Sequence, residues 1–357
     1  MTSVTHTGRF RRLAASVAFC LLTAALLTYT GDVLKPPRTG ASNGAIWSTF
    51  TKLEPDSIDV LFLGNSHTFT GVDPATLWRT SGIPSFVNAG PTQKLAVTNY
   101  YLRESLRSQH PSVVAVEMSS LSYPRLKFDQ AFHDININYM PWSAEKIAAG
   151  IMATPLNESV GALLDLWTYH GRWPDIRRSD FNLLEKDRGG EYLNGFSPRT
   201  KPKAVPETPH TIAPDAIAKT NRSLEYNLES LRQIAATCDE RGIELLLFLT
   251  PTGPPNDYSY QLGRVGATLM AEFDNVHVLD LSEPGAVPGL SYTDDFFDGG
   301  HLVYTGAEKS SAVLAKYLAD TYGLKDRRGD SAYANWSEAV ELRDAFVQRH
   351  KEAPKEK

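Results

Sequence analysis

Five short, nearly continuous apolar runs, separated by longer amphipathic stretches, limit what this chain can fold into. Runs of this kind are typical of strands buried on both faces, and the amphipathic stretches are typical of helices. We predict strands at 58–63, 85–88, 113–118, 243–250 and 276–281. We predict helices at 93–108, 214–241, 261–273 and 305–322. Strands that alternate with helices form a parallel sheet with helices on both faces, so the predicted fold class is α/β.

The N-terminal segment predicts a membrane anchor. Arg9, Arg11 and Arg12 precede an uncharged run, 13–30, which is about the minimum length for a membrane-spanning helix. The positive-inside rule then puts the N-terminus in the cytoplasm and the main domain outside the membrane. A cleaved signal peptide is the alternative, although no A-x-A-like cleavage site follows the run. Both of these alternatives predict that the main domain is exported. A third alternative, a core helix of a soluble protein, does not predict export.

Composition excludes several classes of function. The net charge of −5 is spread along the chain without a basic stripe, so we do not expect nucleic acid as a partner. Of the two cysteines, Cys20 lies in the apolar run, which leaves Cys238 with no partner for a disulfide in the exported part. Neither a CxxC nor an HExxH motif is present, and we predict no metal and no other cofactor.

We divide the chain into four parts. Residues 1–31 form the cytoplasmic stub and transmembrane anchor. Residues 32–56, rich in Pro, Gly, Ser and Thr, predict a flexible linker that lifts the domain off the membrane. The main domain occupies 57–323, and 324–357 is a polar C-terminal extension with a charged helix.

One insertion, 119–213, interrupts the alternation of strands and helices and is rich in Tyr, Trp, His, Asn and Arg. We predict that it forms a lid or substrate platform above the strand ends. The alternative is a helical subdomain whose aromatic residues are its own core. Within it, His170 and Arg172 are candidate contacts for an anionic or hydroxylated polymer, with a structural role as the alternative for both.

Residues suited to acyl-transfer chemistry follow the predicted strands, where ligands bind in doubly wound sheets. Ser66 follows the first strand in a tight turn, where a nucleophile is exposed and backbone N–H groups can stabilise an oxyanion. Gly90 follows the second strand and can offer a further N–H group. Asp298 precedes His301 by three residues, so its carboxylate can orient the imidazole while the other ring nitrogen faces a hydroxyl.

Each of these motifs is weak alone. A Ser at a strand end is commonly a turn or capping residue, and an exposed Asp–His pair is commonly a surface contact. Their joint occurrence in one α/β pattern, in the order Ser66, Asp298 and His301, predicts a serine catalytic triad.

The motifs resemble those of a known family. Asp-Val-Leu-Phe-Leu-Gly-Asn-Ser-His at 59–67 is similar to the first block of the SGNH/GDSL hydrolase superfamily, Asn-Ala-Gly at 88–90 to the second, and Asp-Gly-Gly-His at 298–301 to the last. With the intervening strands, the resemblance covers roughly 57–318. It implies a flavodoxin-like three-layer α/β/α fold with a central parallel five-stranded sheet.

The resemblance also implies a mechanism and a setting. Ser66 forms an acyl-enzyme, His301 is the base, Asp298 orients it, and the backbone N–H groups of Ser66 and Gly90 form the oxyanion hole. An anchored external domain of this kind is similar to the D-alanine transfer protein of teichoic acid synthesis and to the alginate O-acetylation proteins. Those proteins act on envelope polymers beside membrane-bound O-acyltransferases, so such an acyltransferase is a candidate partner.

The chain departs from the superfamily pattern near the nucleophile. The usual Asp before it is Asn65, and the usual Leu after it is His67. The third block should offer an Asn as oxyanion donor, but 116–120 reads Val-Glu-Met-Ser-Ser. Loss of one such donor typically costs about 10²–10³ in rate. Asn65, His67 or a polar residue of the insertion are candidate substitutes, and Glu117 is a candidate either for binding substrate hydroxyls or for pairing with an Arg.

The expected function is an extracytoplasmic O-acyltransferase or esterase that acts on acyl esters of a cell-envelope carbohydrate or polymer. The aromatic insertion favours transfer, because a platform that binds sugar and excludes water protects the acyl-enzyme. The alternative is a catalytically weak or inactive glycan-binding or scaffold protein, which the missing third-block Asn favours. A phosphate-handling enzyme is the third alternative, but the chain has no Gly-rich phosphate loop.

Overall fold

The structure is a computed structural model that describes residues 4–36, 45–123, 130–156, 158–183, 191–207, 214–253 and 257–352. Part of the predicted linker, 37–44, lies outside the described residues, as does the end of the C-terminal extension, 353–357.

A five-stranded sheet in which all the strands are parallel forms the centre of the domain, as predicted. The strands are β1 (Val60–Gly64), β2 (Ser85–Ala89), β3 (Val113–Glu117), β4 (Glu244–Leu249) and β5 (Val276–Asp280). Their order is β2-β1-β3-β4-β5, the order of flavodoxin-like doubly wound sheets. The first three strands are fully buried, which explains why they are continuous apolar runs in the sequence.

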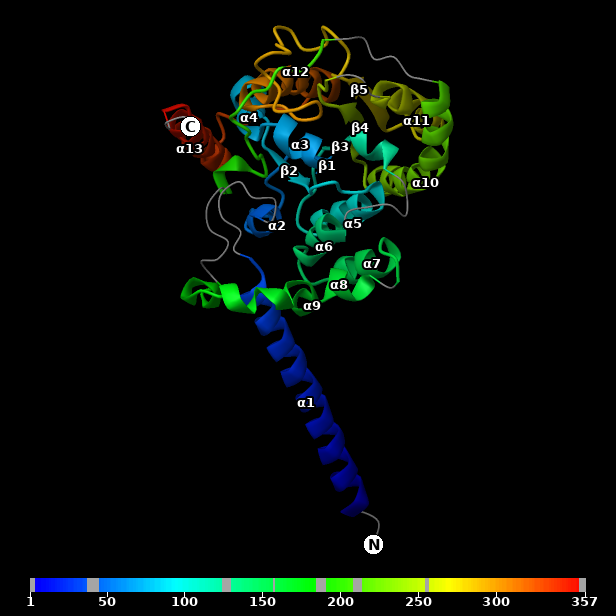
Figure 1. The fold of residues 1–357 in the computed structure, drawn as a ribbon, viewed down its shortest axis with the longest axis vertical. Coiled ribbons are helices and arrows are strands. Elements are labelled where there is room, and N and C mark those ends of the chain that lie inside the picture. Colours follow the sequence, from blue (N-terminus) through cyan, green and yellow to red (C-terminus); the bar gives the residue numbers. More distant parts are fainter. Residues whose placement is uncertain are drawn as a thin grey trace.

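Helices cover both faces of the sheet and produce three layers (Figure 1). One face carries α3 (Ser66–Gly71), α4 (Pro74–Ser81) and α12 (Tyr304–Tyr322). The other face carries α2 (Ala45–Phe50), α5 (Leu95–Ser105), α10 (Pro214–Asp239) and α11 (Tyr258–Glu272). The three-layer α/β architecture is therefore confirmed.

Two predicted peripheral segments belong to the domain, which corrects the predicted boundaries. Helix α2 lies within the predicted linker, yet Trp47 and Phe50 are buried, and the Phe50 ring packs against Phe86 with centroids 5.2 Å apart. Helix α13 (Ala334–Glu352) lies within the C-terminal extension and packs against α4. Its Trp336 stacks on Trp78 with ring centroids 6.2 Å apart.

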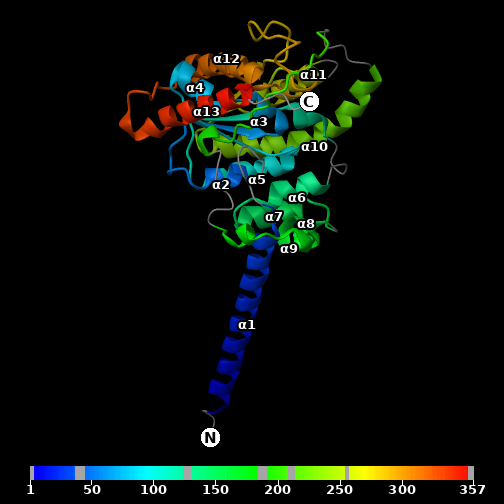
Figure 2. The same cartoon turned by 60° about the vertical axis from the view of Figure 1, so that its left-hand side comes forward.

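Most of the described insertion forms a fourth layer rather than a lid (Figure 1), so this part is not the predicted platform above the strand ends. Its first part lies between α5 and the outer end of the N-terminal helix (Figures 1 and 2). This part consists of α6 (Gln130–Asn138), α7 (Ala144–Met152), α8 (Ser159–Leu163), α9 (Asp165–Tyr169), η2 (His170–Asp175) and η3 (Arg178–Phe181). The preceding η1 (Ser119–Ser122) packs against α10 and α11 instead. Its last described part, 191–207 with η4 (Glu191–Leu193), bonds to β2 through Asn194 and to the loop before α12 through Lys203.

Helix α1 (Val4–Leu34) is the one helix among the described residues that is long and apolar enough to cross a membrane. It is exposed from Gly8 to Tyr29, so it is not a core helix of the domain, and only its last turn is buried. It continues to Leu34, beyond the end of the predicted anchor at residue 31, and enters the domain directly (Figure 1).

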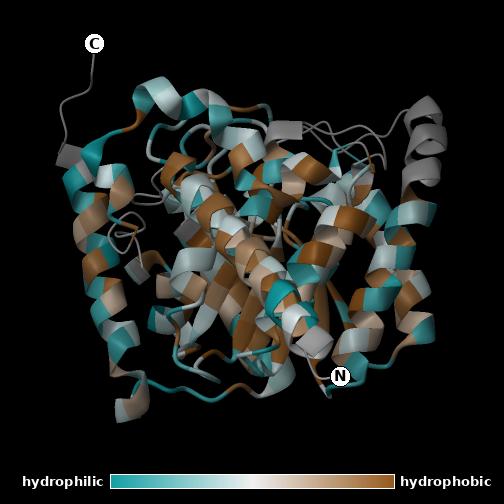
Figure 3. Cartoon of the chain, turned by 90° about the horizontal axis from the view of Figure 1, so that it is seen from below, coloured by the Kyte–Doolittle hydropathy of each residue, from teal (hydrophilic) through white to brown (hydrophobic). Residues whose placement is uncertain are grey.

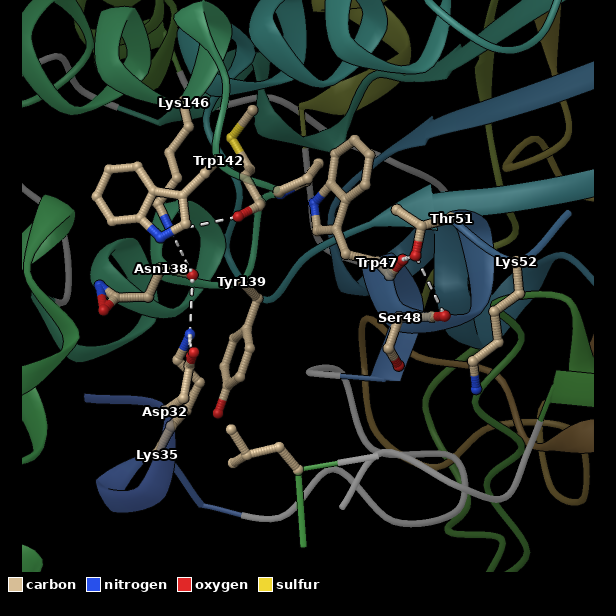
Figure 4. Close-up of a pocket in the computed structure, with 13 residues that line it drawn as sticks. Asp32, Lys35, Trp47, Ser48, Thr51, Lys52, Asn138, Tyr139, Trp142 and Lys146 are labelled. Carbon is tan, nitrogen blue, oxygen red and sulfur yellow. Dashed lines mark hydrogen bonds and ion pairs between the residues drawn. The ribbon is translucent and has the colours of Figure 1, made fainter. Parts of the chain in front are cut away.

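The insertion holds the end of α1 through buried polar contacts. The Lys35 ammonium lies 2.5 Å from the Asp165 carboxylate, and both side chains are 7% exposed. Lys35 and Lys146 both donate to the Asn138 carbonyl, at 3.2 and 2.7 Å (Figure 4). Arg172 donates to the carbonyls of Leu34 and Lys35 at 2.9 and 3.1 Å, which are orphan acceptors at the end of a helix.

These contacts correct two predictions. The predicted linker, 32–56, is not a free tether throughout, because the chain is fixed to the insertion at Lys35, near its start. Arg172 is not a polymer contact in this structure, because Asp180 holds its guanidinium at 2.8 and 3.0 Å while it caps α1.

Candidate active site

The structure brings the three predicted triad residues together from opposite ends of the sequence. His301 Nε2 lies 2.8 Å from Ser66 Oγ, and His301 Nδ1 lies 2.8 and 3.0 Å from the two carboxylate oxygens of Asp298. With the proton on Nδ1 donated to Asp298, Nε2 accepts from the Ser66 hydroxyl. A hydrogen-bond relay of this geometry can convert a serine hydroxyl into a nucleophile.

The loop before α12 holds Asp298 in its ionised form. Partial burial alone raises the pKa of Asp298. The N–H groups of Gly300 and His301, together with the His301 ring, lower this pKa by more than burial raises it, so the net shift is downward. These two N–H groups donate to one carboxylate oxygen at 2.8 and 2.9 Å. An ionised, anchored carboxylate can stabilise the imidazolium that forms when His301 takes the serine proton.

Ser66 stands at the first position of α3 and is separated from the end of β1 by Asn65. Gly64, the last residue of β1, has φ of +141°, and a side chain there would overlap Thr68 and crowd Glu117. Asn65 caps α3 by accepting from the His67 N–H at 2.9 Å. The backbone N–H of Ser66 is one of the first amides of the helix, which have no acceptor within it. That group is a candidate oxyanion donor.

A buried hydrogen-bond chain lies behind the turn that carries Ser66. Asn65 Nδ2 donates to Ser119 Oγ at 2.9 Å, and Ser119 Oγ donates to Glu117 Oε2 at 2.6 Å. Asn65 Nδ2 also lies 3.4 Å from the Tyr123 hydroxyl. Asn65 and Glu117 are fully buried. Both were candidate substrate contacts, and the structure corrects this, because their polar groups face the interior and fix the turn that carries Ser66.

Burial raises the pKa of Glu117 to about 7, although the Ser119 hydroxyl and N–H oppose this shift. Its ordinary value is 4.5, so the folded protein holds this proton more tightly than the unfolded chain does. The contribution of protonated Glu117 to the free energy of unfolding is therefore fully present below about pH 4.5 and is lost as pH rises through about 7. The difference amounts to about 3 kcal/mol.

We expect Glu117→Gln, which cannot ionise, to become more stable relative to the wild type as pH rises from 5 to 8.5. Thermal unfolding of the full chain in detergent across this range measures the effect. Glu54→Gln, at an exposed carboxylate, is the matched control and should follow the wild type. A stability difference between Glu117→Gln and the wild type that stays constant with pH would show that Glu117 has no such role.

His67 packs beside the triad as a neutral ring. Burial, with the nearby His301 ring, lowers the pKa of His67 to about 3. The two imidazole centroids are 5.1 Å apart, and Tyr258 meets His67 edge-on at 5.9 Å. Among the described residues, His67 Nδ1 has no hydrogen-bond partner. His67 therefore remains a candidate donor toward the reacting atoms, unlike Asn65.

Gly90 lies at the end of β2 beside the triad, but its N–H already has an acceptor. It donates to the Gly64 carbonyl at 3.2 Å, which corrects the prediction that this group is free for an oxyanion. A side chain at Gly90 would overlap Asn136 Oδ1 from helix α6 of the insertion. Asn136 in turn donates to the Pro91 carbonyl at 2.9 Å and so fixes the loop after β2.

The remaining predicted site residues are not at the triad. His170 is exposed and its ring lies 2.6 Å from the Trp167 carbonyl, while Arg172 caps α1. Sequence reasoning did not select Ser119, Tyr123 or Asn136 as parts of the site. The position of Ser119 just after β3 is the one signal that could have identified it.

No protein-family model matches this chain. A search of curated proteins finds no match either. The functional conclusion therefore depends on the geometry of the site.

Proposed function

We propose that this protein is an extracytoplasmic serine-dependent O-acyltransferase or esterase of the SGNH-hydrolase kind, working through an acyl-enzyme on Ser66. The observation that carries the proposal is the hydrogen-bond relay from Ser66 through His301 to Asp298, with both contacts at 2.8 Å. The strand order supports the same assignment. So does the position of each block, with the nucleophile after β1, a glycine after β2 and the Asp–His pair before α12.

The reaction follows from the groups present. Ser66 Oγ attacks the carbonyl carbon of an acyl ester while His301 Nε2 takes its proton, and the carbonyl oxygen becomes an oxyanion near the Ser66 N–H. The intermediate collapses, the alcohol leaves with the proton from His301, and the acyl group stays on Ser66. A second hydroxyl then gives its proton to His301, attacks the acyl-enzyme and frees Ser66.

The identity of that second hydroxyl separates transfer from hydrolysis. A carbohydrate hydroxyl of an envelope polymer makes the protein a transferase, and water makes it an esterase. The aromatic residues that favoured transfer in the sequence lie beside α1 rather than at the triad, so they no longer support either outcome. The resemblance of the anchored domain to envelope O-acylation proteins supports a membrane-bound O-acyltransferase as the source of the acyl group.

The experiment that tests this function is the release of nitrophenolate from 4-nitrophenyl acetate by the full-length protein in detergent. A rapid burst followed by slower turnover is expected, because acylation and deacylation are separate steps. A soluble oligosaccharide that accelerates the second phase and gains an acetyl group would identify transfer. An unaltered rate in Ser66→Ala would contradict the proposal.

A second candidate is a glycan-binding or scaffold protein with weak or no activity. One observation favours it: two N–H donors near Ser66 already have hydrogen-bond acceptors within the protein, so they are not available for an oxyanion. The Gly90 N–H bonds to Gly64, and the Asn65 amide bonds to Ser119. This candidate predicts no burst and no acyl-enzyme, whereas the triad geometry predicts both.

A further inference from the structure

The exposed apolar side chains of the domain gather on one part of the insertion. Beyond α1, fourteen described residues are large, apolar and exposed, and eleven of them lie between Phe132 and Phe181. Leu156 is 84% exposed, Met152 is 74% exposed and Trp167 is 64% exposed. A protein surrounded by water rarely exposes so many apolar side chains in one region, so this region contacts something apolar.

This apolar surface adjoins the membrane-spanning helix. A groove of about 710 Å³ lies between α1 and the insertion, lined by Ala24, Leu27 and Thr28 on one side and by Leu164 and Trp167 on the other. Figure 3 shows the molecule from this side, with apolar residues on the helices around α1. The groove is thus continuous with the surface by which α1 meets lipid.

The depth of the groove follows from the helix rise. Ala24 lies six residues before Thr30, the end of the uncharged run, so it is about 9 Å inside the end of the apolar segment. Leu164 and Trp167 face this part of α1 across the groove. Amphipathic elements that lie on a membrane bury their apolar face about 5–10 Å below the headgroups, which is the same depth.

The insertion cannot turn away from this position without breaking buried contacts. Asp165, next to Leu164, is paired with Lys35 at 2.5 Å, and Arg172 caps α1. A side chain at Gly31 of α1 would press on Asp165 at 3.0 Å, which shows how closely α1 and α9 pack. The apolar surface therefore has one orientation relative to α1.

We propose that the underside of the insertion, including Trp142, Leu164 and Trp167, is seated in the outer interface of the bilayer, and that lipid acyl chains fill the groove beside α1. Trp side chains suit this position, since they place an apolar ring in the lipid and an N–H near the headgroups. The domain is then held against the membrane as a rigid body. The occupant we assign is lipid, and a membrane protein or water is the alternative outcome of the test.

The distribution of tryptophans makes the proposal measurable. Helix α1 contains no Trp, so tryptophan emission, excited selectively over that of tyrosine, cannot come from the membrane-spanning segment. Trp47, Trp78 and Trp336 are buried in the domain. Trp142, Trp167 and Trp173 are exposed on the insertion. Bromine atoms on lipid chains quench only those indoles that they contact.

The experiment compares the full-length protein in nanodiscs of brominated and unbrominated phosphatidylcholine. We expect brominated lipid to quench part of the emission, and the triple variant W142F/W167F/W173F to lose that lipid-dependent quenching. Trp336→Phe, the control in the core, should retain it. If the triple variant does not fold, the single variant Trp167→Phe should show a partial loss.

The overturning result is equally direct. Suppose that the wild-type protein resists carbonate extraction, so that α1 is in the membrane, but its emission is the same in both lipids. The insertion would then face water or a protein partner. Quenching that persists unchanged in the triple variant would place the contact elsewhere. Neither result would bear on the triad, because both readouts are independent of ester cleavage.

Discussion

Replacing Ser66 or His301 by Ala is expected to lower kcat for ester cleavage by at least about 10⁴-fold. Ser66 Oγ and His301 Nε2 lie 2.8 Å apart, so either substitution removes the activated nucleophile as a unit. The double variant should therefore be no slower than either single variant. Asp298→Asn should cost about 10⁴-fold, because the Asn amide favours the wrong imidazole tautomer. Steady-state rates with an acetyl ester measure all four variants.

The chain offers a matched control for this prediction. His110 Nδ1 lies 2.5 Å from an Asp56 carboxylate oxygen in an exposed His–Asp pair far from the triad in sequence. His110→Ala should keep the wild-type rate, because in the described structure His110 is bonded to Asp56 and not to a serine hydroxyl. A triad would be contradicted if the activation free-energy losses of the Ser66 and His301 variants added up in the double variant. It would also be contradicted if His110→Ala lowered the rate as much as they do.

Replacing Arg343 by Met is expected to destabilise the folded protein by about 3–5 kcal/mol. Arg343 is 1% exposed, and its guanidinium lies 2.5 Å from Asp73 and 2.7 Å from Glu308. Asp73 is also 1% exposed and caps α4. Without Arg343, the Asp73 carboxylate remains buried without its cation, which accounts for most of the cost. Chemical denaturation of the full-length protein in detergent measures the change.

The double variant D73N/R343M separates this cause from simple loss of packing. Asn still caps a helix but carries no charge, so the double variant should recover much of the stability lost in Arg343→Met. Arg232→Met, which breaks an exposed pair with Glu272, should change little. Equal effects of Arg343→Met and Arg232→Met would mean that α13 is not part of the folded domain.

The sheet and the triad were predictable because their determinants are local. Strands such as β1 and β3 are buried on both faces, so their sequences are continuous apolar runs. The parallel sheet then brings the residues after β1 to one edge, where Ser66 meets His301. Chain order and strand ends were sufficient to select Ser66, Asp298 and His301 as residues that meet in the structure.

The sequence did not show which N–H donors near Ser66 already have acceptors, because this depends on strand register and on residues distant in sequence. The Gly90 N–H is occupied because β1 and β2 pair with Gly64 opposite Ala89. Arg343 appears in the sequence as an ordinary charge on a polar helix, and its burial depends on Asp73, 270 residues away. An exposed aromatic surface has the same composition whether it lies above the strand ends or beside α1, which explains why composition alone did not place the helices of the insertion.

The most direct test of the account is the intact mass of the full-length protein after exposure to a fluorophosphonate, which reacts with activated serines. The triad geometry predicts one adduct on the wild type, located at Ser66, and no adduct on Ser66→Ala or His301→Ala. An unmodified Ser66, under conditions that label a known serine esterase, would contradict an assembled triad and favour the binding or scaffold function.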